Sequence, residues 1–286
     1  MNQIEFYKYT GAGNNYIYID AREINTDWVQ LAKNISDPNF GIGSDGLIIL
    51  DKSKDSADFS MRMFNRDGSE GEMCGNGMRC LARFAKDLNV VPNSKDKITI
   101  STKAGHIHVK PQYSNNIMNS ATVDMGRPIF ETDNIPVISD EFESSIPFVF
   151  FEHNNLKLKL YSVNTGVPHC VAFIDTPVYD FDLEYIGPLV EKYKNFPNKV
   201  NFEIVNIINE NTYDVRVWER GSGITLACGT GAAAVAAISH KLNMHNNNLD
   251  MNFPGGKLTC NWDGENSIFM EGPIEFIGNG TYKIQN

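Results

Sequence analysis

Two cysteines lie in matching local sequences, and a thiol can both accept and donate a proton. Cys74 is followed by Gly-Asn-Gly, and Cys228 is followed by Gly-Thr-Gly. Apolar residues after Cys74 recur at helical spacing, and residues 232–238 after Cys228 are apolar on all sides. We therefore expect both cysteines at helix N-termini, where backbone N–H groups and the helix dipole stabilise a thiolate and bind a carboxylate.

Two equivalent thiols suit a reaction that inverts a stereocentre. One base removes the α-proton of an amino acid from one face, and an acid delivers a proton to the other face. An unperturbed thiol pKa of about 8.5 is close to working pH, and a helix N-terminus can lower it. The sequence therefore indicates proton chemistry at an α-carbon.

The carbanion formed in this chemistry must be stabilised. A pyridoxal enzyme uses a Schiff-base lysine with a phosphate cradle, and no such arrangement is evident in the sequence. Preorganised N–H groups in a cleft closed to water are the alternative, and the expected donors are the backbone groups of Gly75, Asn76, Gly229 and Thr230. We predict no cofactor and no metal, because no ligand cluster supports a metal site at Cys74 and Cys80.

The chain contains the same unit twice. Residues 61–66 align with residues 215–220 at a shift of 154, and the same shift relates Cys74 to Cys228. Upstream, residues 10–20 align with residues 165–175, which places Asn14 opposite His169. We predict an α+β fold of two pseudo-symmetric, sheet-rich domains produced by internal duplication. Each domain is expected to be a curved, mainly antiparallel sheet around a central helix.

The repeat also sets the expected domain boundaries. We place the first domain at residues 1–124 with Cys74, and the second at residues 125–272 with Cys228. The C-terminal strand at residues 273–286 is a candidate to pack with the first domain. A chain of 286 residues is long enough for two domains. The active site is expected in the cleft between them, a usual place for a small-molecule site.

Further elements follow from periodicity and from turn residues. Two short helices are expected at residues 28–35 and 183–193, and a hairpin at residues 98–109. The GxGxxG pattern at residues 41–46 precedes a strand at residues 47–50 instead of following one. It is therefore not interpreted as a dinucleotide site.

Composition limits the classes of partner. The chain has 25 Lys and Arg against 35 Asp and Glu, a net charge of −10, which argues against nucleic acid or an anionic membrane as partner. Its longest apolar stretch, residues 232–238, is too short to span a bilayer, and no signal peptide is evident, so a cytoplasmic protein is expected. Five cysteines without zinc or disulfide spacing predict reduced thiols, with Cys80, Cys170 and Cys260 as packing residues.

On these motifs the chain resembles the diaminopimelate epimerases, pyridoxal-independent enzymes that interconvert LL- and meso-diaminopimelate for lysine and peptidoglycan precursors. The resemblance covers nearly the whole chain, and its strongest motifs are residues 72–80, Pro168-His169, residues 196–201 and residues 218–231. It implies that Cys74 and Cys228 are the catalytic base and acid. It also implies that His169 and Glu219 modulate the pKa values of the cysteines.

The same resemblance implies a set of substrate-binding positions. These are Asn14, Asn65, Gly75, Asn76, Asn201, Glu219, Arg220, Gly229 and Thr230. Diaminopimelate has a second amino acid head, and Arg220 with the amides of Asn65 and Asn201 suits its distal carboxylate. The expected partner is thus a small amino acid substrate, and a homodimer is a further expectation.

Other functions remain open from the sequence. A racemase of proline or hydroxyproline on the same scaffold typically has His after Cys-Gly, where this chain has Asn76. An isomerase of the phenazine-biosynthesis type lacks the cysteine pair, and a non-catalytic amino-acid-binding protein would carry the thiols incidentally. The chain departs from the family pattern at substrate-shell or motif positions that affect substrate detail more than reaction type, namely Asn15, Gly46, Val167 and Ile224.

Overall fold

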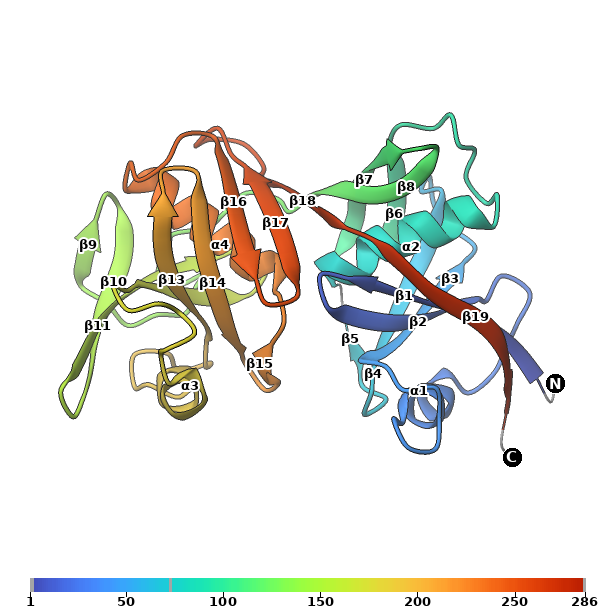
Figure 1. Cartoon of the computed structure of the whole chain (residues 1–286), viewed down its shortest axis with the longest axis horizontal. Helices are drawn as coiled ribbons and strands as arrows, with labels where there is room; N and C mark the ends of the chain where they lie inside the picture. Colours follow the sequence, from blue (N-terminus) through green and yellow to red (C-terminus); the bar gives the residue numbers. More distant parts are fainter. Residues whose placement is uncertain (1–2, 72–73, 285–286) are drawn as a thin grey trace. The chain divides into compact units, whose positions relative to one another are not determined.

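The computed structural model describes residues 3–71 and 74–284 (Figure 1). Glu72 and Met73, which open the first cysteine motif, lie outside the described residues. The chain divides into two compact units, residues 1–123 with 272–286, and residues 124–271. Among the described residues, no helix is both long and apolar enough to cross a membrane.

The first unit is a sheet that packs against two helices. The helices are α1 (Trp28–Ser36) and α2 (Gly75–Asp87). The strands are β1 (Gln3–Gly11), β2 (Asn14–Asp20), β3 (Gly46–Asp51), β4 (Phe59–Asn65), β5 (Glu70–Gly71), β6 (Ile98–Thr102), β7 (Gly105–Ser114), β8 (Ile117–Asp124) and β19 (Glu275–Lys283).

The second unit also combines two helices with a set of strands. Its helices are α3 (Leu183–Glu191) and α4 (Gly229–Lys241). Its strands are β9 (Glu141–Glu143), β10 (Ile146–His153), β11 (Leu156–Asn164), β12 (Pro168–Phe173), β13 (Asn201–Asn209), β14 (Thr212–Glu219), β15 (Gly223–Thr225), β16 (Asn248–Phe253), β17 (Gly256–Asn261) and β18 (Phe269–Pro273).

Strand pairing repeats from one unit to the other. In the first unit β2 pairs with β3 and β4 with β6 in parallel, and in the second β12 pairs with β13 and β14 with β16 in parallel. The hairpins β1–β2 and β11–β12 are both antiparallel, and β19 lies beside β1 as β10 lies beside β11. The predicted fold class, a duplicated and mainly antiparallel α+β structure, is confirmed.

The parallel pairs require crossover connections, and the helices supply them. Helix α1 connects β2 to β3 and α2 connects β4 to β6, while α3 and α4 connect the matching strands of the second unit. Residues 232–238 of α4 are all at most 1% exposed, so the prediction of a helix buried on all sides is confirmed. Cys80, Cys170 and Cys260 are fully buried, as expected of packing residues.

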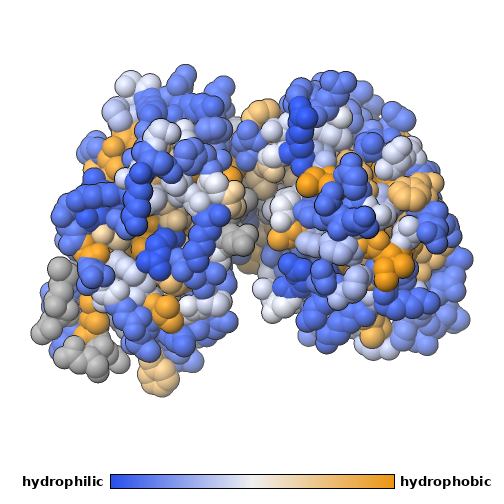
Figure 2. All heavy atoms as spheres, turned by 180° about the vertical axis from the view of Figure 1, so that it is seen from behind, coloured by the Kyte–Doolittle hydropathy of each residue, from blue (hydrophilic) through white to orange (hydrophobic). Residues whose placement is uncertain are grey.

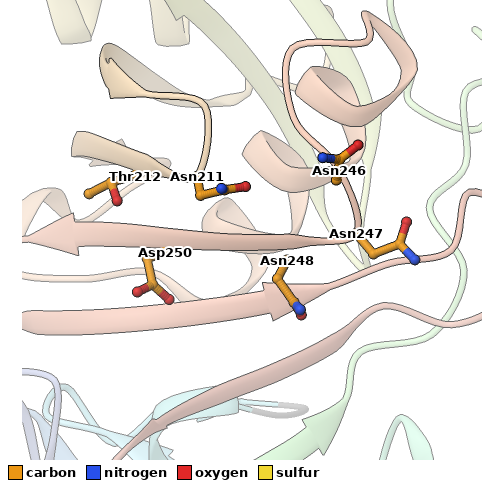
Figure 3. Close-up of a pocket in the computed structure, with 6 residues that line it drawn as sticks. All are labelled: Asn211, Thr212, Asn246, Asn247, Asn248 and Asp250. Carbon is orange, nitrogen blue, oxygen red and sulfur yellow. The ribbon is translucent and has the colours of Figure 1, made fainter.

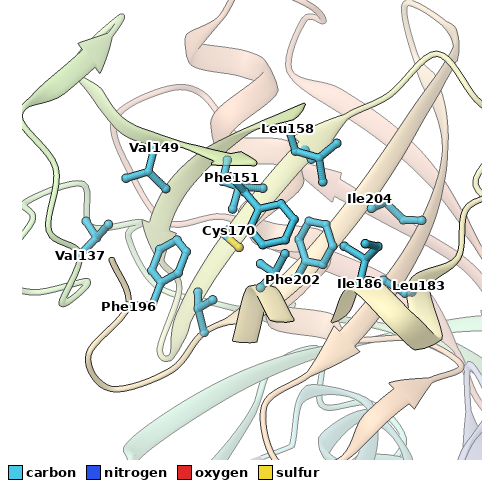
Figure 4. Close-up of a cluster of buried hydrophobic side chains, with 14 of the residues drawn as sticks. Val137, Val149, Phe151, Leu158, Cys170, Leu183, Ile186, Phe196, Phe202 and Ile204 are labelled. Carbon is cyan, nitrogen blue, oxygen red and sulfur yellow. The ribbon is translucent and has the colours of Figure 1, made fainter. Parts of the chain in front are cut away.

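The central strands of each unit bury both of their faces. Because side chains alternate along a strand, Phe202 and Ile204 of β13 point into a core with α3, while Glu203 between them points to the other face, against α4. Figure 4 shows Phe202, Ile204 and Cys170 gathered with Leu183 and Ile186 of α3. This alternation determines which side chain of β13 reaches the start of α4.

The structure differs from the predicted elements in several places, among them β9 and β10, α3 and β5. Strands β9 and β10 were not predicted, because the run from Ile146 to Phe151 is apolar without alternation and Phe150 remains 40% exposed. Helix α3 ends at Glu191, two residues before the predicted end, and contains Pro188. Short strand β5 lies within the segment predicted as a polar loop.

The surface of each unit is mostly polar. Figure 2 shows blue side chains over the visible face of both units, with separate orange spots rather than one broad apolar band. Exposed large apolar side chains include Ile138 at 62% and Phe142 at 55%.

The core between β13 and α3 should carry much of the stability of the second unit. Phe202→Ala removes a fully buried ring and should lower the free energy of unfolding by about 3 to 5 kcal/mol. Ile138→Ala, at a side chain that is 62% exposed, is the control and should change it by less than about 0.5 kcal/mol. Chemical denaturation of both variants measures the difference, and equal effects would contradict this assignment of the core.

Candidate active site

Cys74 and Cys228 occupy equivalent positions at the starts of α2 and α4. Each is the N-cap of its helix with extended backbone, at φ −135° for Cys74 and −126° for Cys228. Gly77 N–H donates to Sγ of Cys74 at 3.4 Å, and Gly231 N–H donates to Sγ of Cys228 at 3.4 Å. The prediction that both cysteines lie at helix N-termini is confirmed, and both thiols accept a hydrogen bond from the first turn.

Two polar side chains of β2 contact the start of α2. The Asn76 amide donates to Oδ1 of Asn14 at 2.5 Å, which joins the turn after β1 to the helix. The Tyr18 hydroxyl donates to the Gly77 carbonyl at 3.2 Å, and burial raises the pKa of Tyr18, with smaller contributions from Cys80 and Cys74. The structure thus brings Asn14 and Asn76 together beside Cys74.

Charged groups surround the start of α4 instead. Nδ1 of His169 lies 2.7 Å from Oε1 of Glu203, and both side chains are fully buried. A ring nitrogen of His169, a carboxylate oxygen of Glu203 and Sγ of Cys228 all lie within 4.8 Å of one another. Oγ1 of Thr230 is 3.3 Å from the same Sγ. This cluster forms around Cys228.

Glu203 was missed from the sequence. Its signal is a single carboxylate within the apolar run of β13, between Phe202 and Ile204. The strand period alone would place it on the opposite face from these two residues. Only the packing of β12, β13 and α4 shows that this face meets His169 and Cys228.

The pKa of Cys228 is raised well above the ordinary value of a thiol. Burial is the largest cause, followed by the negative charges of Glu219 and Glu203. Hydrogen bonds from Thr230 and Gly231 act in the opposite direction but are outweighed. The first turn of the helix does act to lower the thiol pKa, but for Cys228 desolvation and two carboxylates outweigh it.

Glu219 is the last residue of β14 and faces the same cluster. Burial raises its pKa, which Thr225 and His169 partly offset. The Thr225 hydroxyl donates to its carboxylate. Glu219 contributes to the raised pKa of Cys228, and His169 lies in the same cluster as its thiol. A pKa-modulating role for this pair stays a prediction.

Arg220 is fixed through its backbone and its side chain. Its N–H donates to Oδ1 of Asn201 at 2.8 Å, and the Asn201 amide donates to the Pro168 carbonyl at 2.8 Å. Nη1 of Arg220 donates to the Asn198 carbonyl at 3.0 Å. The half-buried guanidinium has five N–H donors. The hydrogen bond to Asn198 uses one of them, so two parallel N–H groups remain available to a ligand carboxylate.

The remaining predicted residues are less closely connected. The Thr165 hydroxyl donates to the Thr230 carbonyl at 2.8 Å, which ties the turn before β12 to α4. Asn65 ends β4, and its amide donates to Ser69 at 3.0 Å. A role for Asn65 and for the backbone groups of Gly75 and Gly229 in binding stays a prediction.

The cluster at Cys228 also has the side-chain types of a metal site. Thiolate, imidazole and carboxylate are zinc ligands, and the three side chains lie close enough to share one ion. Two of them are already joined by the His169–Glu203 hydrogen bond. The prediction that the protein uses no metal stays a prediction.

A separate pocket lies on another part of the second unit. It has a volume of about 630 Å³ and is lined by polar side chains, shown in Figure 3: Asn211, Thr212, Asn246, Asn247, Asn248 and Asp250. Its only carboxylate, on Asp250, already accepts hydrogen bonds from Lys257 and Thr259. None of the residues predicted for the site lines this pocket.

Comparison with solved structures defines the class of fold. A phenazine biosynthesis protein of the PhzF family from Bacillus anthracis superposes with a TM-score of 0.70 at 16% identity, covering 99% of this chain and 100% of that one. A hydroxyproline epimerase from Agrobacterium vitis superposes with a TM-score of 0.70 at 13% identity, covering 100% and 95%. The chain therefore has the duplicated α+β fold found in epimerases and related proteins.

Sequence comparison identifies the family within that class. The model of the family described as diaminopimelate epimerase matches residues 6–131 and 161–277. Diaminopimelate epimerases from Oceanobacillus iheyensis and Carboxydothermus hydrogenoformans are 40% and 41% identical, with 98% of this chain and 98% and 99% of theirs covered. The chain belongs to the diaminopimelate epimerase family, and it is an isomerase.

Gly231 should be needed for the contacts around Cys228. A Cβ at this position would lie 2.5 Å from Oε1 of Glu203 and 3.2 Å from Cβ of Cys228. Gly231→Ala should therefore displace Glu203 and lower the free energy of unfolding by about 1 to 3 kcal/mol. It should also shift or remove the downfield proton NMR signal of the His169 Nδ1–H.

Gly278→Ala is the matched control, because a Cβ there would meet nothing within 4 Å. It should leave both the unfolding free energy and the imidazole signal unchanged. A Gly231→Ala protein with native stability and an unaltered imidazole signal would contradict the packing described here.

Proposed function

We propose that the protein epimerises LL-2,6-diaminopimelate to meso-diaminopimelate, in the route to lysine and peptidoglycan precursors, without a cofactor. The observation that carries the proposal is the equivalence of two thiols, each accepting a hydrogen bond from the third residue of its own helix. Membership of the family and the names of relatives at about 40% identity give the substrate.

The reaction needs one thiolate and one thiol on opposite faces of the α-carbon. The thiolate takes the α-proton, and the electron pair left behind is delocalised into the α-carboxylate. Backbone N–H groups at the first turns of α2 and α4 stabilise that charge, for which Gly75, Asn76, Gly229 and Thr230 are the proposed donors. The thiol then gives its proton to the opposite face, and the two cysteines exchange protonation states.

Because the pKa of Cys228 is raised, we propose that this residue is the protonated thiol before substrate binds. In the direction that begins from this state, Cys74 is the base and Cys228 is the acid. In the reverse direction the roles exchange, as microscopic reversibility requires. His169 and Glu219, which lie near Sγ of Cys228, adjust its protonation.

Arg220 recognises the distal carboxylate of the substrate. Its backbone is held by Asn201 and its side chain by the Asn198 carbonyl, so the fork is oriented before substrate binds. A bidentate Arg–carboxylate contact distinguishes diaminopimelate from amino acids without a second head. Asn65 and Asn14 complete the binding groups.

The enzyme acts in the cytoplasm as a homodimer in this proposal. The substrate is a small amino acid, and the net charge of −10 disfavours nucleic acid or an anionic membrane as a partner. Phe276 and Ile277 of β19 are 46% and 54% exposed, and exposed apolar side chains of this kind support a contact between copies.

Removal of either thiol tests the two-base mechanism. Cys74→Ala and Cys228→Ala should each abolish epimerisation of LL-diaminopimelate, because each removes a proton carrier from one face. The measurement is incorporation of deuterium at the α-carbon in D₂O together with formation of the meso isomer. Cys260→Ala, at a buried thiol outside the cysteine motifs, is the control.

Near-wild-type epimerisation by either of the first two variants would exclude the two-base mechanism. Wild-type protein that binds diaminopimelate without any α-deuteration would instead be an amino-acid-binding protein.

Arg220→Lys tests the choice of substrate. Lysine keeps the charge but cannot form a two-pronged contact, and a charge-assisted hydrogen bond contributes about 1.5 to 3 kcal/mol, so kcat/KM for diaminopimelate should fall roughly 10- to 150-fold. A truncated amino acid without the distal head should be nearly unaffected. The measured quantity is the ratio of the two kcat/KM values in wild type and variant, and an unchanged ratio would assign Arg220 a different role.

A further inference from the structure

The two units differ at one matched position beneath their cysteine helices. A Cβ at Gly77 would meet Cδ1 of Ile48 at 2.5 Å, and a Cβ at Gly231 would meet Oε1 of Glu203 at 2.5 Å. Ile48 is the third residue of β3 and Glu203 is the third residue of β13. The duplicated fold therefore places an aliphatic side chain under one cysteine motif and a carboxylate under the other.

The fold itself does not need a carboxylate at this position. Ile48 and Glu203 are both fully buried, so the first unit completes the same packing with an apolar side chain. Burying a carboxylate is unfavourable unless it is paired. Within the described part of the chain, Glu203 is paired through Nδ1 of His169 at 2.7 Å. The presence of a carboxylate at position 203 is therefore better explained by the groups that it contacts than by packing.

Those neighbours are His169 and the catalytic thiol. With Nδ1 as the donor to Glu203, a neutral imidazole carries its lone pair on Nε2. Nε2 of His169 and Oε2 of Glu203 are buried and have no hydrogen-bond partner among the described residues. Both side chains lie within reach of Sγ of Cys228, as the 4.8 Å cluster shows.

We propose that Glu203 is a positioning residue for the half of the reaction at Cys228: it orients His169 through Nδ1 and places a carboxylate within reach of Sγ of Cys228. This inference rests on the proposed epimerase function for its effect on catalysis. The groups that face Cys228 are Glu203 from β13, His169 from β12, Glu219 from β14, and Thr230 from α4 itself.

Two substitutions separate charge from orientation. Glu203→Gln removes the charge but keeps an oxygen that can accept from Nδ1–H of His169. Glu203→Ile introduces the residue type that the first unit uses and removes both effects. Thermal unfolding of each variant verifies that it folds, and the near-isosteric Glu203→Gln carries the test if Glu203→Ile does not fold.

The primary measurement is the rate of alkylation by iodoacetamide as a function of pH, followed by peptide mapping. Cys74 in the same chain is the internal control. In both variants the midpoint for Cys228 should move to lower pH by about one to three pH units, since a negative charge close to the thiol is lost. The midpoint for Cys74 should stay in place. An unmoved Cys228 midpoint, or equal movement of both cysteines, would overturn the proposal.

Steady-state kinetics with diaminopimelate give the second readout. Glu203 is fully buried, so its loss is expected to act through His169 and Cys228. We expect kcat to fall about 10- to 100-fold, the range found when partners that orient metal ligands are lost, with KM close to wild type. Glu203→Ile should lose more than Glu203→Gln. Raised KM with unchanged kcat would overturn the positioning role. If wild-type protein does not epimerise diaminopimelate, the proposed function fails while the alkylation comparison still tests the effect on Cys228.

Discussion

Parallel pairing of β4 with β6, and of β14 with β16, determines where the two thiols lie. A parallel pair cannot be joined by a tight turn, so a helix must cross between the strands in each unit. That crossover begins at Cys74 in one unit and at Cys228 in the other. The hydrogen bond from the third helical residue to each Sγ follows from this geometry. The N–H groups proposed to bind substrate belong to the same first turns.

Duplication produced two similar scaffolds, but their electrostatic environments are different. The amides of Asn14 and Asn76 pair at the start of α2, whereas the carboxylates of Glu203 and Glu219 and the imidazole of His169 lie near Cys228. An enzyme that works from both faces of a carbon needs one proton acceptor and one proton donor at the start of each turnover. Different side chains around the two cysteines can give them different protonation states while both units keep the same fold.

Much of the site could be predicted from sequence, because the cysteines, their glycines and the helices that follow are contiguous in the chain. The N-cap positions follow from the residues next to Cys74 and Cys228, and the burial of α4 follows from its unbroken apolar run. The His169–Glu203 contact joins residues 34 positions apart and depends on the register of two parallel strands, so periodicity could not reveal it. Strand β10 was missed because an apolar run without alternation does not distinguish a strand from a buried helix.

Strand β19 pairs with β1 in a register that joins Gln3 to Lys283, so the first unit contains segments from both ends of the described chain. During synthesis, β1 emerges from the ribosome long before its partner exists. The sheet of the first unit can be completed only after the whole second unit has been made, whereas the second unit is one continuous stretch. Contacts of such high sequence separation form slowly, so the second unit is expected to fold first and the unit with Cys74 to close last.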